Sequence, residues 1–589
     1  MKSFFKKDSV FSVMLILLFT KVLGFVKLRT FAQLFGASHQ LDIFWASFTI
    51  PDIIFMILVA GSVNAAVLPI LTDVLYDKGK KDLNRLFLQI TEVFFGLSVL
   101  MVGVIFIFAP QITTAIVSND SLQQILNFSS RISTDDYDLF IKLLRIGLLS
   151  PLALGVSGFI TAYLQVRKRF FITSLAPLFY NVAMIIGPML LVKSLGMGVE
   201  AIAISAVAGS FLHLLIQLPD LFKYLKTEGV KRFSIFKVTQ SKNVRKTFKL
   251  AFPRTLGIFG EQVNVIVNTV ISFTLPAGAL SAYKFAYSLH LFPVNIIGSA
   301  IAQVTMPDLA EFSCKNQKDE FRKALNNALQ FSLYLVLPIV SVMLVLRLPI
   351  VRLIYGTGAF DWQDTLITAW SLALLSISVI GQTVVQLVLR AFYALQDTWR
   401  PLIAIVIGIV INLLGAYYLT NFFSHYYDWR PILEQIFIQI KDSNGTELSV
   451  VLASFFSDTW SWMNSRGDST LAVGGLAQSL SLSYFAQMII SIMLLNKKVS
   501  VFSWKETMYP ILLKLLNSAI MIMGMYFVFR LFDLQLDTSR TIQVIVLTIV
   551  VTIYGGLSYL VGSMLLSQEE FKQFEKLLKK LLKRFKRKI

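Results

Sequence analysis

Long apolar segments dominate this sequence and constrain its fold more than any other feature. A helix needs about 20 mainly apolar residues to cross a bilayer. Only 15% of the 589 residues are charged and 56% are hydrophobic, whereas soluble domains carry about 25% charged residues. The sequence therefore predicts an all-α integral membrane protein with about 14 transmembrane helices. These lie near 10–34, 43–70, 87–115, 139–163, 171–192, 201–221, 250–275, 285–310, 326–346, 365–395, 402–423, 471–495, 508–531 and 541–563.

The basic residues between these runs predict the orientation of the chain. With the N-terminus inside, the segments that would face the cytoplasm hold 36 Lys and Arg, and the opposite segments hold 9. Positive residues are retained on the cytoplasmic side of a membrane, so both termini are expected there. The net charge of +20 then records membrane orientation, and no nucleic-acid partner is expected.

The loops predict how the chain is organised. Two six-helix lobes are expected, joined by a basic cytoplasmic linker and followed by two further helices. The predicted parts are a lobe at 1–222, the linker at 223–249, a lobe at 250–495 with an external insertion at 424–470, two helices within 496–563, and a tail at 564–589. The insertion is either an interfacial aromatic cap or a variable surface insertion.

The tail places apolar residues three and four apart between nine Lys and Arg. This pattern is typical of an amphipathic helix on a membrane surface, so anionic lipids are its expected partner.

Motifs for catalysis are missing from the sequence. It contains neither a G-x-x-x-x-G-K-[ST] phosphate loop nor an H-E-x-x-H zinc motif. Cys314 is the only cysteine, so neither a disulfide within the chain nor a Cys-ligated zinc site is available. We therefore expect no catalytic residue, metal or cofactor.

Charged residues inside the predicted helices are the best candidates for a functional site, because burying a charge in a membrane is costly. One hypothesis is an electropositive cavity, lined by Lys21, Lys27 and Arg254, that attracts an anionic head group such as a pyrophosphate. The alternative is that these cations snorkel or pair with Asp42, Asp52 and Glu261. The other charged candidates are Arg29, Asp42, Asp52, Glu261 and Arg390, of which Arg390 lies near the inner end of its helix, where it can snorkel.

Several short motifs, in the same order along the chain, resemble the MurJ/MviN family of lipid II flippases. The matches begin with KVLGF at 21–25, LFGA at 34–37, DIF at 42–44, IP at 50–51 and AVLP at 66–69. They continue with AP at 176–177, FP at 292–293, YG at 355–356 and FYALQDT at 392–398, of which the last is the most specific. The motif positions that we take as structural are Gly24, Gly36, Pro51, Asn181, Asn268, Pro293, Gly356, Arg390, Asp397 and Pro401.

The resemblance implies a fold in which two lobes form a V around a central cavity. It also implies a transport activity. That activity is the transfer of undecaprenyl-pyrophosphate-linked peptidoglycan precursor from the inner to the outer leaflet of a bacterial inner membrane. Alternating access of the cavity and possible contacts with cell-wall synthesis proteins are expected. Transport would depend on membrane potential, an unidentified coupling ion or mass action. The alternatives are an exporter of another polyprenyl-linked oligosaccharide or of a small molecule, and a non-transporting membrane scaffold.

Two positions depart from the family pattern. The family usually has arginines where this chain has Phe55 and Ser288. Lys284, one turn before Ser288, and Arg254 are hypothesised to replace the missing positive charge.

Overall fold

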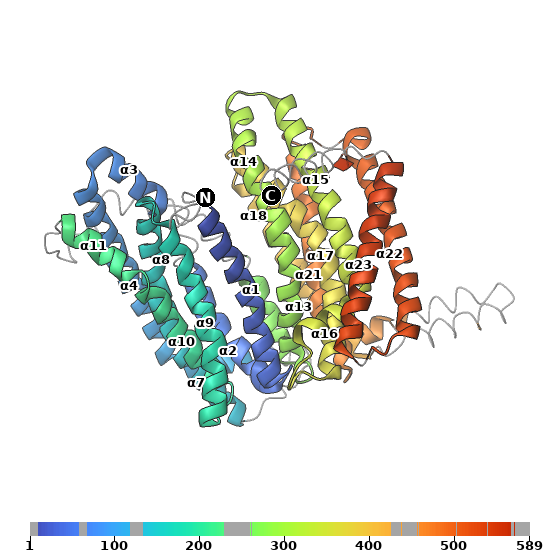
Figure 1. The fold of residues 1–589 in the computed structure, drawn as a ribbon, viewed down its shortest axis with the longest axis horizontal. Helices are drawn as coiled ribbons and strands as arrows, with labels where there is room; N and C mark the ends of the chain where they lie inside the picture. Colours follow the sequence, from blue (N-terminus) through green and yellow to red (C-terminus); the bar gives the residue numbers. More distant parts are fainter. Residues whose placement is uncertain are drawn as a thin grey trace, which may run out of the picture. The chain divides into compact units, whose positions relative to one another are not determined.

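The fold of this chain is helical throughout the residues that the structure describes (Figure 1). The computed structural model describes residues 10–57, 67–117, 134–228, 260, 262–425, 438, 456–457, 459–501, 503–538, 540–566 and 570–571. Over these ranges no strand occurs, and 11 helices are long and apolar enough to cross a membrane. The prediction of an all-α, multi-pass membrane protein is confirmed. The count of about 14 helices and the V-shaped arrangement of the lobes stay predictions.

The chain divides into two compact units. One contains Met1–Ser281 and Thr357–Asp361, and the other contains Ala282–Gly356 and Trp362–Ile589. Residues 262–281 thus group with the first unit, whereas the sequence assigns them to the second lobe. Most of the linker 223–249 lies outside the described residues, so the predicted lobe boundaries stay predictions.

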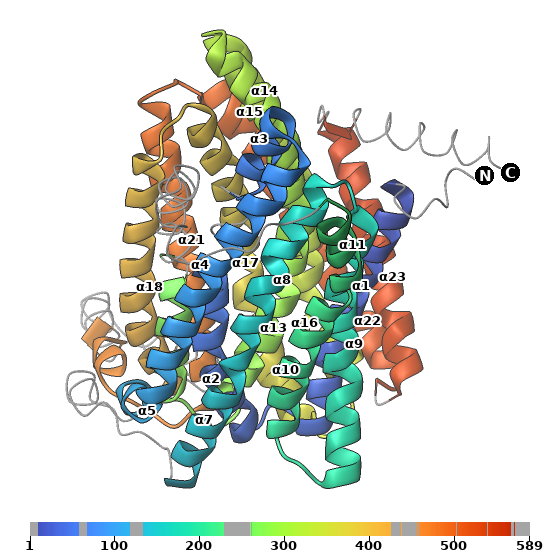
Figure 2. The ribbon, with the colours of Figure 1, turned by 90° about the vertical axis from the view of Figure 1, so that its left-hand side faces the viewer.

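The first unit is a bundle in which α9 packs against α1 and α10, while α8 packs against α4 and α10 (Figure 2). The ring of Tyr163 is fully buried in this bundle, 4.6 Å from that of Phe87. Its helices are α1 (Val10–Phe35), α2 (His39–Phe55), α3 (Leu68–Lys78), α4 (Lys80–Ile107), α5 (Ala109–Val117), α7 (Thr134–Gly147), α8 (Leu149–Val166), α9 (Phe170–Leu195), α10 (Glu200–Leu215) and α11 (Leu218–Glu228).

In the second unit α21 packs between α17 and α18, and the pair α22 and α23 packs against α15. Small residues permit the closest approach: a Cβ atom on Gly475 would lie 2.2 Å from the backbone nitrogen of Thr420 in α18. Its helices are α13 (Ala279–Pro293, which begins in the first unit), η4 (Val294–Gly298), α14 (Ser299–Cys314), α15 (Lys318–Val345), α16 (Arg347–Tyr355), α17 (Trp362–Ala394), α18 (Trp399–His425), η5 (Thr470–Ala472), α21 (Val473–Asn496), η6 (Trp504–Met508), α22 (Tyr509–Gln535) and α23 (Thr541–Leu565).

The two units repeat one pattern of helices. In each, a 28-residue helix (α4 or α15) is followed, after a single intervening residue, by the start of a further helix (α5 or α16). The turns after α8 and α17 also match, because Lys168 and Gln396 both adopt a left-handed conformation with φ of 61° and 55°. In both turns the N–H of this residue donates to the carbonyl three positions before it. The N–H of the following residue donates to the carbonyl five positions before it, as in a Schellman motif. Such internal repetition is typical of membrane transporters.

The turn between α17 and α18 carries the most specific sequence motif, and Asp397 holds it together. Its Oδ2 atom accepts a hydrogen bond from Lys498 Nζ at 3.1 Å and lies 3.1 Å from Arg400 Nη1. Its Oδ1 atom accepts the backbone N–H of Arg400 at 3.3 Å. Burial by itself would raise the pKa of the Asp397 carboxyl. The hydrogen bonds and the two cations outweigh burial and hold the pKa below its usual range.

We predict that Asp397→Asn lowers the stability of the folded protein at neutral pH by about 1 kcal/mol or less, the range of exposed ion pairs. A depressed pKa contributes stability above the unfolded value of about 4, and this stability is lost as the pH falls through the folded value. The difference in thermal midpoint between wild type and variant should therefore shrink as the pH falls below about 4. Asp319→Asn, at an exposed position in α15, is the control. A difference that stays constant down to pH 3 contradicts this account.

Candidate functional site

The basic residues of α1 differ in their surroundings. Lys21 is exposed, whereas Lys27 and Arg29 are partly buried. The ammonium of Lys27 lies 5.9 Å from the centre of the Tyr180 ring in α9, a distance at which a cation is attracted to an aromatic face. Of the three cations predicted in this helix, Lys27 is therefore held against a second helix by a defined contact.

Asp52 of α2 forms a small cluster with Lys27 and Tyr180. Its carboxylate interacts electrostatically with both Lys27 and Tyr180. The residue after Tyr180, Asn181, donates from Nδ2 to the carbonyl of Thr20 at 3.2 Å and thereby ties α9 to α1. We name Lys27, Asp52 and Tyr180 the α1 cluster. It brings together one predicted cavity cation and one of the acids that the sequence offered as its partner.

Asp42, at the start of α2, is buried and makes three strong hydrogen bonds. Its Oδ2 atom accepts the backbone N–H of Gly278 at 2.7 Å. Its Oδ1 atom accepts the backbone N–H of Ser281 at 2.7 Å and the hydroxyl of Ser281 at 2.6 Å. Since these N–H groups belong to the residue before α13 and to its first turn, the Asp42 carboxylate caps α13 from a different helix, at an end where a negative charge is favourable. We call Asp42, Gly278 and Ser281 the Asp42 clamp.

The backbone around the clamp requires glycine. Gly278 has φ of +85°, and a Cβ atom on it would lie 2.0 Å from the carbonyl oxygen of Ala37. A second close approach lies at Gly358, with φ of +64°, where a Cβ atom would lie 2.3 Å from the carbonyl of Gln33. The end of α1 and the start of α2 therefore contact two segments that follow them in the chain by more than 230 residues.

In the second unit, Ser288, where the family usually has an arginine, makes a hydrogen bond with an uncharged side chain. The Ser288 hydroxyl lies 2.7 Å from the Tyr355 hydroxyl, which also donates to the carbonyl of Phe285 at 3.3 Å. Tyr355 is fully buried. Lys284, one turn before Ser288, is partly buried. Arg254 and Glu261 lie outside the described residues, so the hypothesis that Lys284 and Arg254 replace the missing arginines stays a prediction.

The remaining predicted motif residues occupy turns, helix ends and buried helix positions. Pro51, Asn181, Asn268 and Pro401 are buried, Phe55 and Arg390 are partly buried, and Pro293 directly precedes the π-helical segment η4. Gly36 has φ of 60°. A Cβ atom on Gly356 would lie 2.6 Å from the carbonyl of Arg352, whereas one on Gly24 would meet nothing within 4 Å.

Sequence reasoning missed four charged residues that the structure singles out. Glu92 lies near the middle of α4, and Arg145 of α7 lies 5.0 Å from the centre of the Phe106 ring. Lys514 and Glu570 form a buried ion pair at 3.1 Å. The first three lie inside predicted apolar runs, and this placement is the signal that could have identified them.

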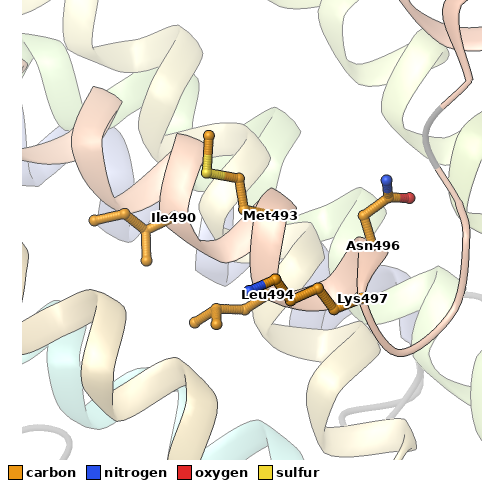
Figure 3. Close-up of a pocket in the computed structure, with 5 residues that line it drawn as sticks. All are labelled: Ile490, Met493, Leu494, Asn496 and Lys497. Atoms are coloured by element: carbon orange, nitrogen blue, oxygen red, sulfur yellow. The ribbon is translucent and has the colours of Figure 1, made fainter.

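A shallow recess lies on the last turns of α21 (Figure 3). Its lining consists of Ile490, Met493, Leu494, Asn496 and Lys497. None of these is a predicted site residue. Among the described residues, no group of three or more His, Cys, Asp and Glu side chains is placed to hold a metal ion.

Comparison with known proteins shows what the chain is similar to. Residues 31–427 match the family described as "Lipid II flippase MurJ". The probable lipid II flippase MurJ of Buchnera aphidicola subsp. Acyrthosiphon pisum (strain APS) is 28% identical over 414 residues, which are 70% of this chain and 78% of the relative. The lipid II flippase MurJ of Burkholderia cenocepacia is 26% identical over 415 residues, 69% of this chain and 77% of the relative.

Solved structures show the same fold. A structure of lipid II flippase MurJ in an inward closed conformation has a TM-score of 0.67 at 21% identity and covers 95% of this chain and 99% of its own. An inward-facing multidrug transporter of the MATE family has a TM-score of 0.59 at 13% identity, covering 82% and 94%. The structural likeness at these identities shows the fold alone. The sequence match covers more than half of the chain, so the resemblance is confirmed and the protein belongs to the lipid II flippase MurJ family.

Proposed function

We propose that this protein is a flippase that moves lipid II, the undecaprenyl-pyrophosphate-linked peptidoglycan precursor, from the inner to the outer leaflet. The observation that carries the proposal is the family membership of residues 31–427. The named relatives cover more than three quarters of their own length in the match, which supports an activity of the whole chain. The proposed location is the bacterial inner membrane, with both termini in the cytoplasm.

The physical task of such a flippase is to carry an anionic head group across hydrocarbon. A pyrophosphate with its sugars loses its hydration on entering an apolar medium, at a cost that only charged and polar partners offset. Lys27 supplies a positive charge within the first long apolar helix, and its position against Tyr180 holds the ammonium in place. We propose that the phosphate group competes with Asp52 for Lys27, so that this cation binds the head group without holding it permanently.

Alternating access is the proposed mechanism, and the Asp42 clamp is its proposed checkpoint. The division between the two units falls inside α13, directly after Ser281. A change in the relative positions of the units would therefore act on the turn that Asp42 caps. We propose that this clamp forms in one access state and opens in the other. Membrane potential or an ion gradient is the proposed energy source, since the sequence has no phosphate loop.

One observation favours a second candidate cargo. At Ser288 the family's usual arginine is replaced by a neutral hydroxyl bonded to Tyr355. Arginine binds a phosphate with two parallel hydrogen bonds. Lys284, which is hypothesised to replace this charge, would act as a point charge. A different polyprenyl-linked oligosaccharide is therefore the alternative substrate class.

Complementation tests the proposed function directly. We predict that the chain restores growth and cell shape to a bacterium depleted of its own lipid II flippase. Membrane insertion and expression are verified in the same cells with an epitope tag. If the inserted protein fails to complement while a MurJ from another bacterium succeeds, the lipid II assignment is wrong and the alternative cargo is favoured.

We further predict graded effects at Asp42. Asparagine retains one carbonyl oxygen and so keeps part of the clamp, whereas alanine removes all three hydrogen bonds. Hydrogen bonds to charged groups each contribute about 1.5–3 kcal/mol. Complementation efficiency and thermal midpoint should therefore fall in the order wild type, Asp42→Asn, Asp42→Ala.

The matched control is Asp138→Asn, an exposed acid in α7, which should behave as wild type. If Asp42→Ala complements fully and unfolds at the wild-type temperature, the clamp has no role in transport or stability.

A further inference from the structure

Lys514 is a fully buried cation in α22, outside the site described above. Its Nζ atom donates to Gln330 Oε1 of α15 at 2.7 Å and lies 3.1 Å from Glu570 Oε1. Both charged side chains are buried, with exposed fractions of 1% and 9%. A buried lysine is costly unless it is paired and hydrogen-bonded, and removing one partner of such a pair leaves an uncompensated charge. The Glu570 carboxylate is therefore held in place by its partner.

A row of polar residues on α15 builds this site. Arg322, Asn326 and Gln330 follow at intervals of four, so they lie on one face of the helix. Arg322 forms an ion pair with Glu506, and Asn326 Nδ2 donates to the Glu506 carbonyl at 3.0 Å. Gln330 Nε2 donates to the carbonyl of the next residue, Thr507, at 3.0 Å. The row fixes η6 and the start of α22 on α15 and orients the Gln330 amide so that its oxygen faces Lys514.

The position of this site along the helix places it close to the membrane surface. Trp504 and Tyr509, at the start of η6 and α22, are exposed aromatic residues, a type enriched at the membrane–water interface. Lys514 follows Tyr509 by five residues, about 7.5 Å along a helix axis. Glu570 follows the end of α23 by five residues. Lys514 thus lies less than about one and a half turns inside Tyr509, close to the membrane surface at which the chain leaves its last transmembrane helix.

We propose that Lys514 and Gln330 form an intramolecular binding site for the Glu570 carboxylate, which anchors the basic C-terminal tail at the depth of anionic lipid headgroups in the inner leaflet. Nine Lys and Arg follow within residues 572–588. An anchored tail keeps these cations at the membrane surface, where each contributes to attraction by anionic lipid. The proposal rests on the proposed cytoplasmic location of the C-terminus and is independent of the transported substrate.

Limited trypsin cleavage after Lys572 tests this proposal on the full-length protein in vesicles. Two compositions are used: phosphatidylcholine alone, and phosphatidylcholine with an equal amount of phosphatidylglycerol. Cleavage of a docked segment follows the population of its open form. We expect Glu570→Gln and Lys514→Met each to accelerate cleavage about tenfold or more. Wild type should be cleaved more slowly in the anionic vesicles. Asp319→Asn, which removes an exposed acid at the start of α15 outside the docking site, is the matched control and should change little.

The pair itself is tested by combining substitutions. The double variant Lys514→Met with Glu570→Gln should be cleaved after Lys572 no faster than the faster of the two single variants. Wild-type cleavage rates in Glu570→Gln, or strictly multiplicative effects in the double variant, overturn the docking site. Equal wild-type rates in the two vesicle types overturn the lipid contact. Neither readout requires transport, so a failed complementation leaves this test unaffected.

Discussion

The cost of placing charge in hydrocarbon is the constraint on which this structure depends. An ionised side chain within a membrane needs an opposite charge, hydrogen bonds or an aromatic face. Lys27 has Asp52 and the Tyr180 ring, and Lys514 has Glu570 and the Gln330 amide. The contacts with Tyr180 and Gln330 join helices that are far apart in the sequence, so the partners that each lysine requires also hold its helix against another.

Lys514 and Lys27 differ in how accessible their charged groups are to a ligand. Lys514 is enclosed, with its hydrogen-bond partners supplied by the chain itself. Lys27 is only partly buried and interacts with an acid that is exposed. An enclosed pair stabilises one arrangement, whereas a partly buried cation remains available to an incoming anion. This difference is the physical basis for assigning a structural role to Lys514 and a substrate role to Lys27.

The helical, multi-pass character was predictable from the sequence, because long apolar runs leave few alternatives. The family was predictable from short motifs such as FYALQDT at 392–398. The pairing of Asp42 with Ser281, 239 residues later, was not predictable, because hydropathy carries no information about which helix ends meet. The helix end at Ile107 was missed, since apolar residues continue across it, whereas the predicted end at 346 lies one residue from the observed end at Val345. The shared fold of MurJ and a MATE transporter shows why cargo must be argued from side chains.

The most direct test of this account is lipid II translocation by the purified protein in vesicles, with Lys27→Met compared with Lys21→Met. Both substitutions remove one charge from α1, but only Lys27 is held against Tyr180 near Asp52. We predict that wild type and Lys21→Met translocate lipid II at similar rates and that Lys27→Met is slower by about tenfold or more. Equal rates for Lys27→Met and wild type, with both proteins folded and inserted, would contradict the assignment of the head-group site to the α1 cluster.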